Sequence, residues 1–136
     1  MSTNWKWPGS RWWRVDFHAH TPKSYDYRPR SAREDPDWVE WVAAARDSGI
    51  QAVAITDHNT ADAVDPLQKA ASEDEHAPVL FPGIELTADD GSHLLLLLDP
   101  DSGSQHVEEL LSRAGVTVDA RGKSQSRSSQ RGTDHG

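Results

Sequence analysis

Short apolar runs alternate with stretches of helical periodicity along most of this chain. The runs that predict strands lie at residues 15–18, 51–56, 79–85 and 93–98. Apolar side chains at helical spacing predict helices over residues 35–48, 65–75 and 107–114. A loop is expected over residues 21–34, which carry turn formers and scattered charge. The predicted order is strand, helix, strand, helix, strand, strand, helix.

The ends of two predicted helices carry recognisable signals. The dipeptides at 35–36 and 65–66 are both Asp-Pro, which places a carboxylate at the N-cap and proline at the first helical position. Gly49 and Gly115 are expected to end the first and last helix, because glycine readily adopts the left-handed conformation found after helix C-termini.

The run at residues 93–98 is continuously apolar and shows no alternation. Such a run is typical of a strand buried on both faces of a parallel sheet that has helices outside it. Together with the order of elements, it predicts an α/β fold with right-handed crossovers. An open sheet and an incomplete barrel are both compatible with this pattern.

Apolar residues concentrate within residues 12–118, where a core is feasible. Residues 1–11 are expected to form an irregular leader rich in tryptophan, and residues 119–136 a polar, disordered tail. Two interpretations of the tryptophans stay open. They either pack against the outside or one end of the domain, or they form an interface with a partner. These tryptophans are Trp5, Trp7, Trp12 and Trp13.

Charge and cysteine content exclude several classes of function. The net charge of −8 argues against a protein that coats nucleic acid, although bound divalent cations would still allow phosphate substrates. The chain has no cysteine, so any metal must be held by His, Asp and Glu. The longest apolar run, residues 94–98, is too short to cross a membrane, and the first residues do not form a signal peptide. A cytoplasmic protein is the expectation.

Polar side chains follow the predicted strands. His18 and His20 end the first strand and share a face, Asp57 and His58 follow the second, and Glu85 ends the third. Active sites of parallel α/β folds collect at these carboxyl ends. His93 instead begins its strand, which requires a strand running the other way or a ligand just before it. Together these residues predict a His/carboxylate site for more than one metal.

Four motifs resemble those of the polymerase and histidinol phosphatase (PHP) domain family. They are residues 16–21 (DFHAHT), 54–59 (AITDHN), 82–85 (PGIE) and 91–95 (GSHLL). The resemblance covers roughly residues 12–118 and implies part of a distorted (β/α)7, TIM-like barrel with largely parallel strands and outer helices. It also implies two or three divalent metals at the strand C-termini.

The resemblance carries ligand roles to matching positions. His18, His20 and Glu85 would hold one metal, Asp26 and His58 a second, and His93 with Glu85 a third. Asp57 would orient an imidazole through its free ring nitrogen, and Asp16 would give similar support. Mixed nitrogen and oxygen ligation suits Zn, Mn or Fe.

Two family features do not occur in the sequence. These are a further His after a later strand and a closing Asp-x-His, and the Asp-His at 134–135 is interpreted as coincidence. The chain is therefore expected to be an incomplete fragment. A closer resemblance, to TrlF-like proteins, rests on residues 9–18, 57–59, 81–83, 93 and 99–100. It implies a downstream SMC/AAA-type ATPase region, of which no residues are present.

The implied activity is hydrolysis of a phosphoester, including nucleotide or nucleic-acid phosphates, by a metal-activated water. Arg28, Arg30 or Lys23 would hold the substrate phosphate, although solvated loop charges are the alternative for each. The main alternative function is a non-catalytic PHP module that serves a larger ATPase or polymerase-associated protein as a scaffold or regulator.

Overall fold

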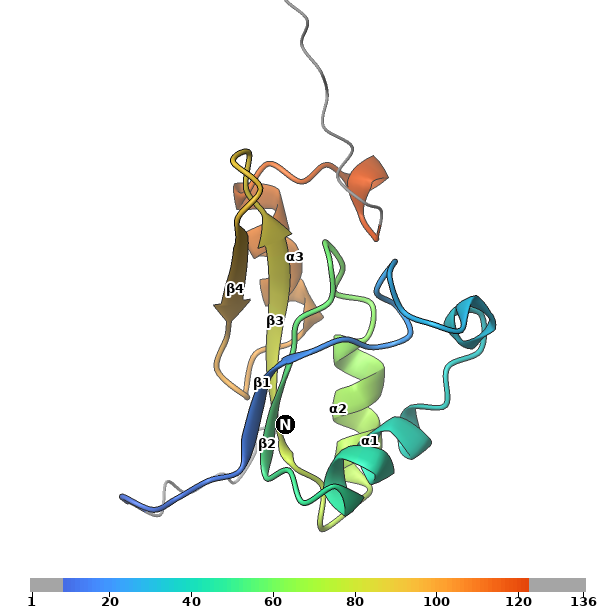
Figure 1. Cartoon of the computed structure of the whole chain (residues 1–136), viewed down its shortest axis with the longest axis vertical. Coiled ribbons are helices and arrows are strands. Elements are labelled where there is room, and N and C mark those ends of the chain that lie inside the picture. The colour runs from blue at the N-terminus through green and yellow to red at the C-terminus, as the bar shows by residue number, and fades with distance from the viewer. Residues whose placement is uncertain (1–8, 123–136) are drawn as a thin grey trace, which may run out of the picture.

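The computed structural model describes residues 9–122 and contains one sheet with helices packed against it (Figure 1). The leader residues Trp5 and Trp7 lie outside the described part. In chain order, the elements are β1 Val15–Ala19, η1 Arg30–Arg33, α1 Trp38–Asp47, β2 Ala52–Ile55, α2 Val64–Ser72, β3 Val79–Thr87, β4 His93–Leu97, α3 Ser104–Arg113 and η2 Val118–Ala120.

The sheet is curled, mostly parallel and open at both edges. Its strand order is β1-β2-β3-β4, with β1, β2 and β3 parallel to one another. In Figure 1, α1 and α2 lie to one side of β2 and β3, and α3 lies behind β3. Within the described residues this is an α/β half-barrel with three α-helices, which agrees with the predicted α/β class. The full seven-stranded closure is not shown.

The helices bury their apolar stripes in two adjoining clusters. The first packs α1 and α2 against β2 and is built around residues such as Val42, Ile55 and Leu67. The second packs α3 against β3, where Ile84 and Leu111 are fully buried. Every residue of β2 is buried, as expected for a central strand. Because β2 and β3 each pair with a strand on both sides, their carboxyl ends carry polar side chains at defined positions in the sheet.

The apolar run of β4 suggested a parallel strand buried on both faces, and this interpretation of the run was wrong. β4 is antiparallel to β3, and its Leu94, Leu95 and Leu97 side chains are 50%, 38% and 39% exposed. The alternate residues Leu96 and Leu98 pack against the α3 cluster. The α3 cluster covers only part of this run, so a continuous apolar run need not be buried on both faces.

The predicted N-caps were also misplaced, although the helices themselves are present. α1 is capped by Asp37, whose Oδ1 accepts a 2.9 Å hydrogen bond from the Glu40 amide, so Asp35 lies before the cap. Helix α2 starts at Val64, one residue before Asp65. The Asp65 carboxylate instead accepts hydrogen bonds from the amide and hydroxyl of Ser104, which tie α2 to the start of α3.

Gly49 and Gly115 follow the helices as predicted, with φ values of 82° and 80°. Past α3, Ala120 of η2 packs against the α3 cluster, and the Gly122 amide donates to the Asn59 carbonyl at 3.0 Å. These contacts belong to the first residues of the predicted tail, and residues 123–136 lie outside the described part. None of the helices within residues 9–122 is long and apolar enough to cross a membrane.

A bulge in β1 changes where its histidine points. Asp16 pairs with Val53 and Ala19 with Ile55, so three steps along β1 match two along β2. Successive strand residues normally face opposite sides, and a bulge re-aims a side chain locally. Phe17 consequently packs edge-on against Phe81 of β3, while His18 contacts Glu85 on the same face of that strand.

Asp16 stabilises this bulge from within. Its Oδ1 accepts a 3.0 Å hydrogen bond from the backbone N–H of His18. This hydrogen bond reaches the backbone that carries His18 and not an imidazole ring nitrogen, and a supporting role of Asp16 at a metal site stays a prediction.

Gly83 allows β3 to lie close to both neighbouring strands. A Cβ at this position would lie 2.5 Å from the Leu96 carbonyl oxygen of β4 and 3.3 Å from the Ile55 carbonyl oxygen of β2. We expect Gly83→Ala to lower the free energy of unfolding by roughly 1–3 kcal/mol, the usual cost of overpacking. Urea denaturation measures this directly, and an unchanged midpoint would contradict the close packing.

Candidate metal centre

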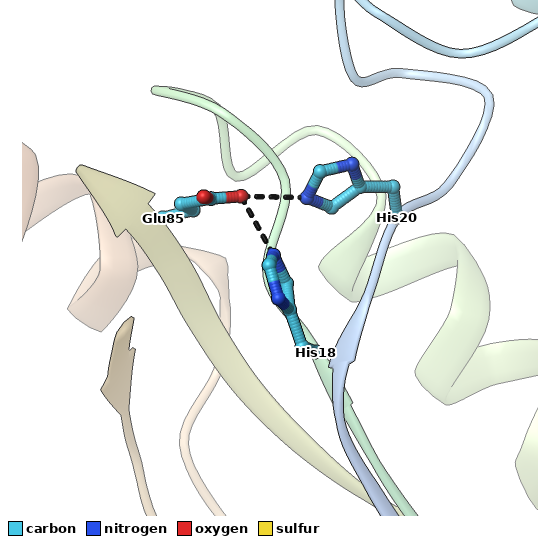
Figure 2. A group of neighbouring side chains, drawn as sticks. All are labelled: His18, His20 and Glu85. Atoms are coloured by element: carbon cyan, nitrogen blue, oxygen red, sulfur yellow. Dashed lines mark hydrogen bonds and ion pairs between the residues drawn. The ribbon is translucent and has the colours of Figure 1, made fainter. Parts of the chain in front are cut away.

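Glu85 lies at the middle of a group of imidazoles at the end of β3. Its side chain is only 4% exposed, and its Oε2 lies 2.8 Å from Nε2 of His18 and 2.8 Å from Nε2 of His20. Figure 2 shows both rings turned toward the carboxylate from β1 and the chain directly after it. His58 approaches the same oxygen, with its Nε2 at 3.3 Å. One carboxylate oxygen is thus shared by three ring nitrogens.

Backbone pairing brings His58 to this position. The chain continues past β2, and the Glu85 amide donates a 3.1 Å hydrogen bond to the Asp57 carbonyl. This forms an isolated parallel bridge between His58 and Glu85. Asn59 then turns the chain away with φ 54°, a left-handed conformation that asparagine adopts more easily than most residues. The motif at 57–59 is therefore a strand extension that ends in a sharp turn.

His93 reaches Glu85 from the other side because β4 is antiparallel. Its Nδ1 lies 3.0 Å from Oε1 of Glu85, and Thr87 Oγ1 lies 3.4 Å from the same nitrogen. The first residue of an antiparallel strand meets the last residues of its partner, as the Thr87–His93 pairing shows. Of the two options left open by the sequence, a strand running the other way is the one observed.

A second group overlaps the first. Asp26 Oδ2 lies 3.2 Å from Nδ1 of His20 and 3.4 Å from Nε2 of His58. His20 therefore stands between two carboxylates, with Glu85 on its Nε2 side and Asp26 on its Nδ1 side. In each of the two groups, His18, His20 and Glu85, and His20, Asp26 and His58, the donor atoms lie within 4.8 Å of one another.

The electrostatics of the carboxylates favour cation binding. Burial alone would raise the pKa of Glu85, but hydrogen bonds from His18 and His20 outweigh it, so the pKa lies below its ordinary value. Burial likewise acts to raise the pKa of Asp26, and the Ser24 hydrogen bond and the charges on His20 and His58 reverse this. Both groups stay ionised at neutral pH, as metal ligands must be.

His58 is suited to act as a neutral ligand. Burial lowers its pKa, and this outweighs the opposing effects of Glu85 and Asp26. A neutral imidazole offers a lone pair to a cation, whereas a protonated one does not. The donor set, with buried carboxylate and imidazole atoms converging on one point, fits a divalent cation of the kind that accepts mixed nitrogen and oxygen ligands.

Comparison with known proteins places this arrangement in a family. Residues 16–132 match the model of the PHP domain. The chain belongs to the PHP domain family. The match begins at Asp16, in the bulged strand that carries His18, and it includes every residue of the two donor groups.

Two relatives of this PHP domain are larger proteins. An error-prone DNA polymerase of Symbiobacterium thermophilum is 30% identical over 107 residues, which are 79% of this chain and 9% of the polymerase. A crystal structure of a protein from Bifidobacterium adolescentis, assigned as a metal-dependent phosphoesterase, is 26% identical with a TM-score of 0.49. That match covers 74% of this chain and 32% of the other. The chain thus spans less than a tenth of the polymerase and about a third of the second protein.

The hydrogen bonds of Asp57 differ from the predicted ones. Its carboxylate accepts hydrogen bonds from the Thr21 amide at 2.7 Å and the Thr21 hydroxyl at 2.6 Å, and not from an imidazole. Thr21 directly follows His20, so Asp57 fixes the chain that carries a candidate ligand. Thr21 and Ser24 are fully buried polar residues for which no role was predicted. Their hydroxyls have no periodic or charge signal, and only their places between His20 and Asp26 single them out.

The residues expected to hold phosphate lie on or next to the loop that carries Asp26. Arg28 is an exposed residue of the loop before η1, and Lys23 lies on the same loop. Arg30 begins η1, and its side chain lies outside the part of the structure that is described. A phosphate-holding role for these cations therefore stays a prediction.

Burial gives Asp57 a measurable pH dependence in the metal-free protein. Burial raises its pKa to about 6 from 3.8, against the lowering effect of the Thr21 hydrogen bonds. A raised pKa means that this group favours the folded state below pH 4 and loses that contribution as the pH rises to 6. The change is on the order of 2–3 kcal/mol, because one pKa unit is about 1.4 kcal/mol.

We expect the free energy of unfolding of wild type to fall relative to that of Asp57→Asn by about 2–3 kcal/mol between pH 4 and pH 7, because asparagine does not titrate. Urea denaturation in the presence of a chelator measures it, with the exposed Asp62→Asn variant as a control for net charge. A difference that does not change with pH would show that Asp57 titrates normally.

Proposed function

We propose that this PHP domain is a metal-dependent phosphoesterase, which hydrolyses a phosphoester with water. The observation that carries the proposal is the buried Glu85 carboxylate, whose two oxygens face the imidazoles of residues 18, 20, 58 and 93 at 2.8–3.3 Å. Neutral imidazoles and an ionised carboxylate that converge in this way offer the nitrogen and oxygen donors that a divalent cation takes.

In this proposal, His18, His20 and Glu85 hold one cation, and Asp26 with His58 holds a second beside it. Glu85 lies within reach of both because its Oε2 also approaches His58. Divalent cations bound there would supply Lewis acidity, which polarises a phosphoryl group and makes water a nucleophile at neutral pH. Zn, Mn and Fe fit the donors.

The site has an open side and a closed side. Glu85 and His58 are 4% and 8% exposed in their side chains, whereas His18 and His93 are 52% and 56% exposed. The closed side orients the ligands, and a phosphoryl group would approach between the exposed imidazoles. His93 would bind a third cation with Glu85 or contact the substrate directly.

The test is hydrolysis of p-nitrophenyl phosphate and bis(p-nitrophenyl) phosphate by the purified full chain. We expect turnover with added Mn²⁺, none with chelator, and a loss of roughly 100-fold or more in His20→Ala, because aligned ligands are needed for the metal-assisted step. His76→Ala removes an exposed histidine that contacts only the Glu75 side chain among the described ion pairs, and it should leave the rate unchanged. Equal rates in both variants would contradict the proposal.

A second candidate function is a non-catalytic module whose cations are structural. The similarity to an error-prone DNA polymerase supports this second candidate, since the matching region is a small part of a protein whose named activity is polymerisation. This candidate predicts bound metal and metal-dependent stability without hydrolysis of either ester. For the hydrolytic function, nucleotides and nucleic-acid ends are the natural esters to test next. For the non-catalytic function, we propose an ATPase partner of the kind found in TrlF-like proteins.

A further inference from the structure

Asp26 has to be held in place by something other than a strand. It lies on the loop between β1 and η1, and its side chain is 40% exposed. A carboxylate in such a place would normally sample several rotamers in water. Its Oδ2 nevertheless faces both His20 and His58, at 3.2 and 3.4 Å.

The hydroxyl of Ser24 accounts for this orientation. Ser24 is fully buried, and its Oγ donates a 2.7 Å hydrogen bond to Oδ1 of Asp26. The same Oγ accepts a hydrogen bond from the backbone N–H of His58 at 3.3 Å. One hydroxyl thus fixes the far oxygen of Asp26 and the backbone of His58, and the near oxygen is left facing the imidazoles.

Ser24 is in turn fixed to the sheet. Its amide donates to the Thr21 carbonyl at 2.9 Å, and its carbonyl accepts from the Tyr27 amide at 3.1 Å. Thr21 is anchored by its two hydrogen bonds to Asp57, and its Oγ1 accepts from the Lys23 amide at 3.1 Å. A chain of hydrogen bonds, buried at Asp57 and Thr21 and partly exposed at Asp26, therefore runs from the residues after β2 through Thr21 and Ser24 to Asp26.

We propose that Ser24 is a positioning residue, which holds Asp26 in the rotamer that serves the second cation and leaves the first cation's ligands untouched. This inference rests on the proposed metal site. A hydrogen-bonded partner behind a ligand commonly changes metal affinity 10–100-fold when it is removed. Ser24 contacts neither His18 nor Glu85 among the described hydrogen bonds, so its effect falls on one of the two donor groups.

The experiment is calorimetric titration of Mn²⁺ into the full chain, for wild type, Ser24→Ala, Asp26→Asn and the double variant. The binding step that is weakened in Asp26→Asn identifies the second site. We expect Ser24→Ala to weaken that same step about 10–100-fold and to leave the other step within about twofold. If Ser24 acts through Asp26, the double variant loses no more than Asp26→Asn alone, since coupled residues are not additive.

Ser104→Ala is the matched control. Ser104 Oγ donates a 2.6 Å hydrogen bond to Asp65, a serine–aspartate pair of similar length at the start of α3. Both steps should be unchanged in this variant. The inference would be overturned if Ser24→Ala weakened both Mn²⁺ binding steps equally or left the step at the second site unchanged. It would also be overturned if the double variant lost the sum of the two single losses. Wild-type protein that binds no Mn²⁺ would instead contradict the proposed function itself.

Discussion

Glu85→Gln is expected to abolish cation binding at both donor groups of the candidate metal centre. Glutamine keeps the size of the side chain and removes the negative charge, and its amide nitrogen cannot act as an acceptor. Because Oε2 of Glu85 faces His18, His20 and His58 together, one substitution removes the oxygen donor of the first group and the negative charge beside His58 of the second group. We expect affinity for Mn²⁺ or Zn²⁺ to fall by more than roughly 100-fold, beyond the usual effect of an outer partner.

The measurement is metal content after dialysis, together with calorimetric titration. Glu75→Gln is the control, since Glu75 is exposed and contacts only His76 among the described ion pairs. Circular dichroism confirms that the variant is folded, and the metal-free protein should tolerate the isosteric change. Glu85→Gln protein with the metal content of wild type would show that the cations are bound elsewhere.

Bound cations are expected to produce the second large effect, a rise in stability. The donors come from β1, the following loop, the end of β2, β3 and β4, so a cation joins segments that are separated along the chain. A ligand that binds only the folded state stabilises it by about 2.7 kcal/mol at one hundred times its Kd. For a domain of this size, that corresponds to a rise in Tm of roughly 10 °C.

Differential scanning calorimetry with and without chelator measures this shift. His76→Ala should keep the whole shift, and His20→Ala should lose most of it because His20 belongs to both donor groups. An identical Tm for wild type in Mn²⁺ and in chelator would show that the segments are not joined by cations.

The sequence could predict the collection of donors because strand ends are encoded locally. His58 and Glu85 follow buried apolar residues of β2 and β3, His18 lies near the end of the more exposed β1, and parallel strands bring such ends to one edge of a sheet. The sequence could not predict the direction of β4, since an apolar run looks the same in either direction. His93 was the informative residue, because a ligand at the start of a strand meets the others only when that strand is reversed.

Two other differences have physical causes that short patterns do not contain. Asp35 and Asp37 are both acceptable N-caps, and only the geometry of the first turn selects Asp37, whose carboxylate reaches the Glu40 amide. The roles of Thr21 and Ser24 depend on hydrogen bonds to Asp57 and Asp26 across the fold. Hydroxyl groups of this kind are recognised only when the tertiary arrangement is known.

The most direct test of the central claim is the anomalous scattering of crystals of this chain grown with Mn²⁺. The account predicts a peak within about 2.0–2.4 Å of a Glu85 carboxylate oxygen and of ring nitrogens of His18 and His20, the usual range for such bonds. A second peak is predicted beside Asp26 and His58. Peaks only at other carboxylates, with the Glu85 carboxylate still hydrogen-bonded to the imidazoles, would contradict it.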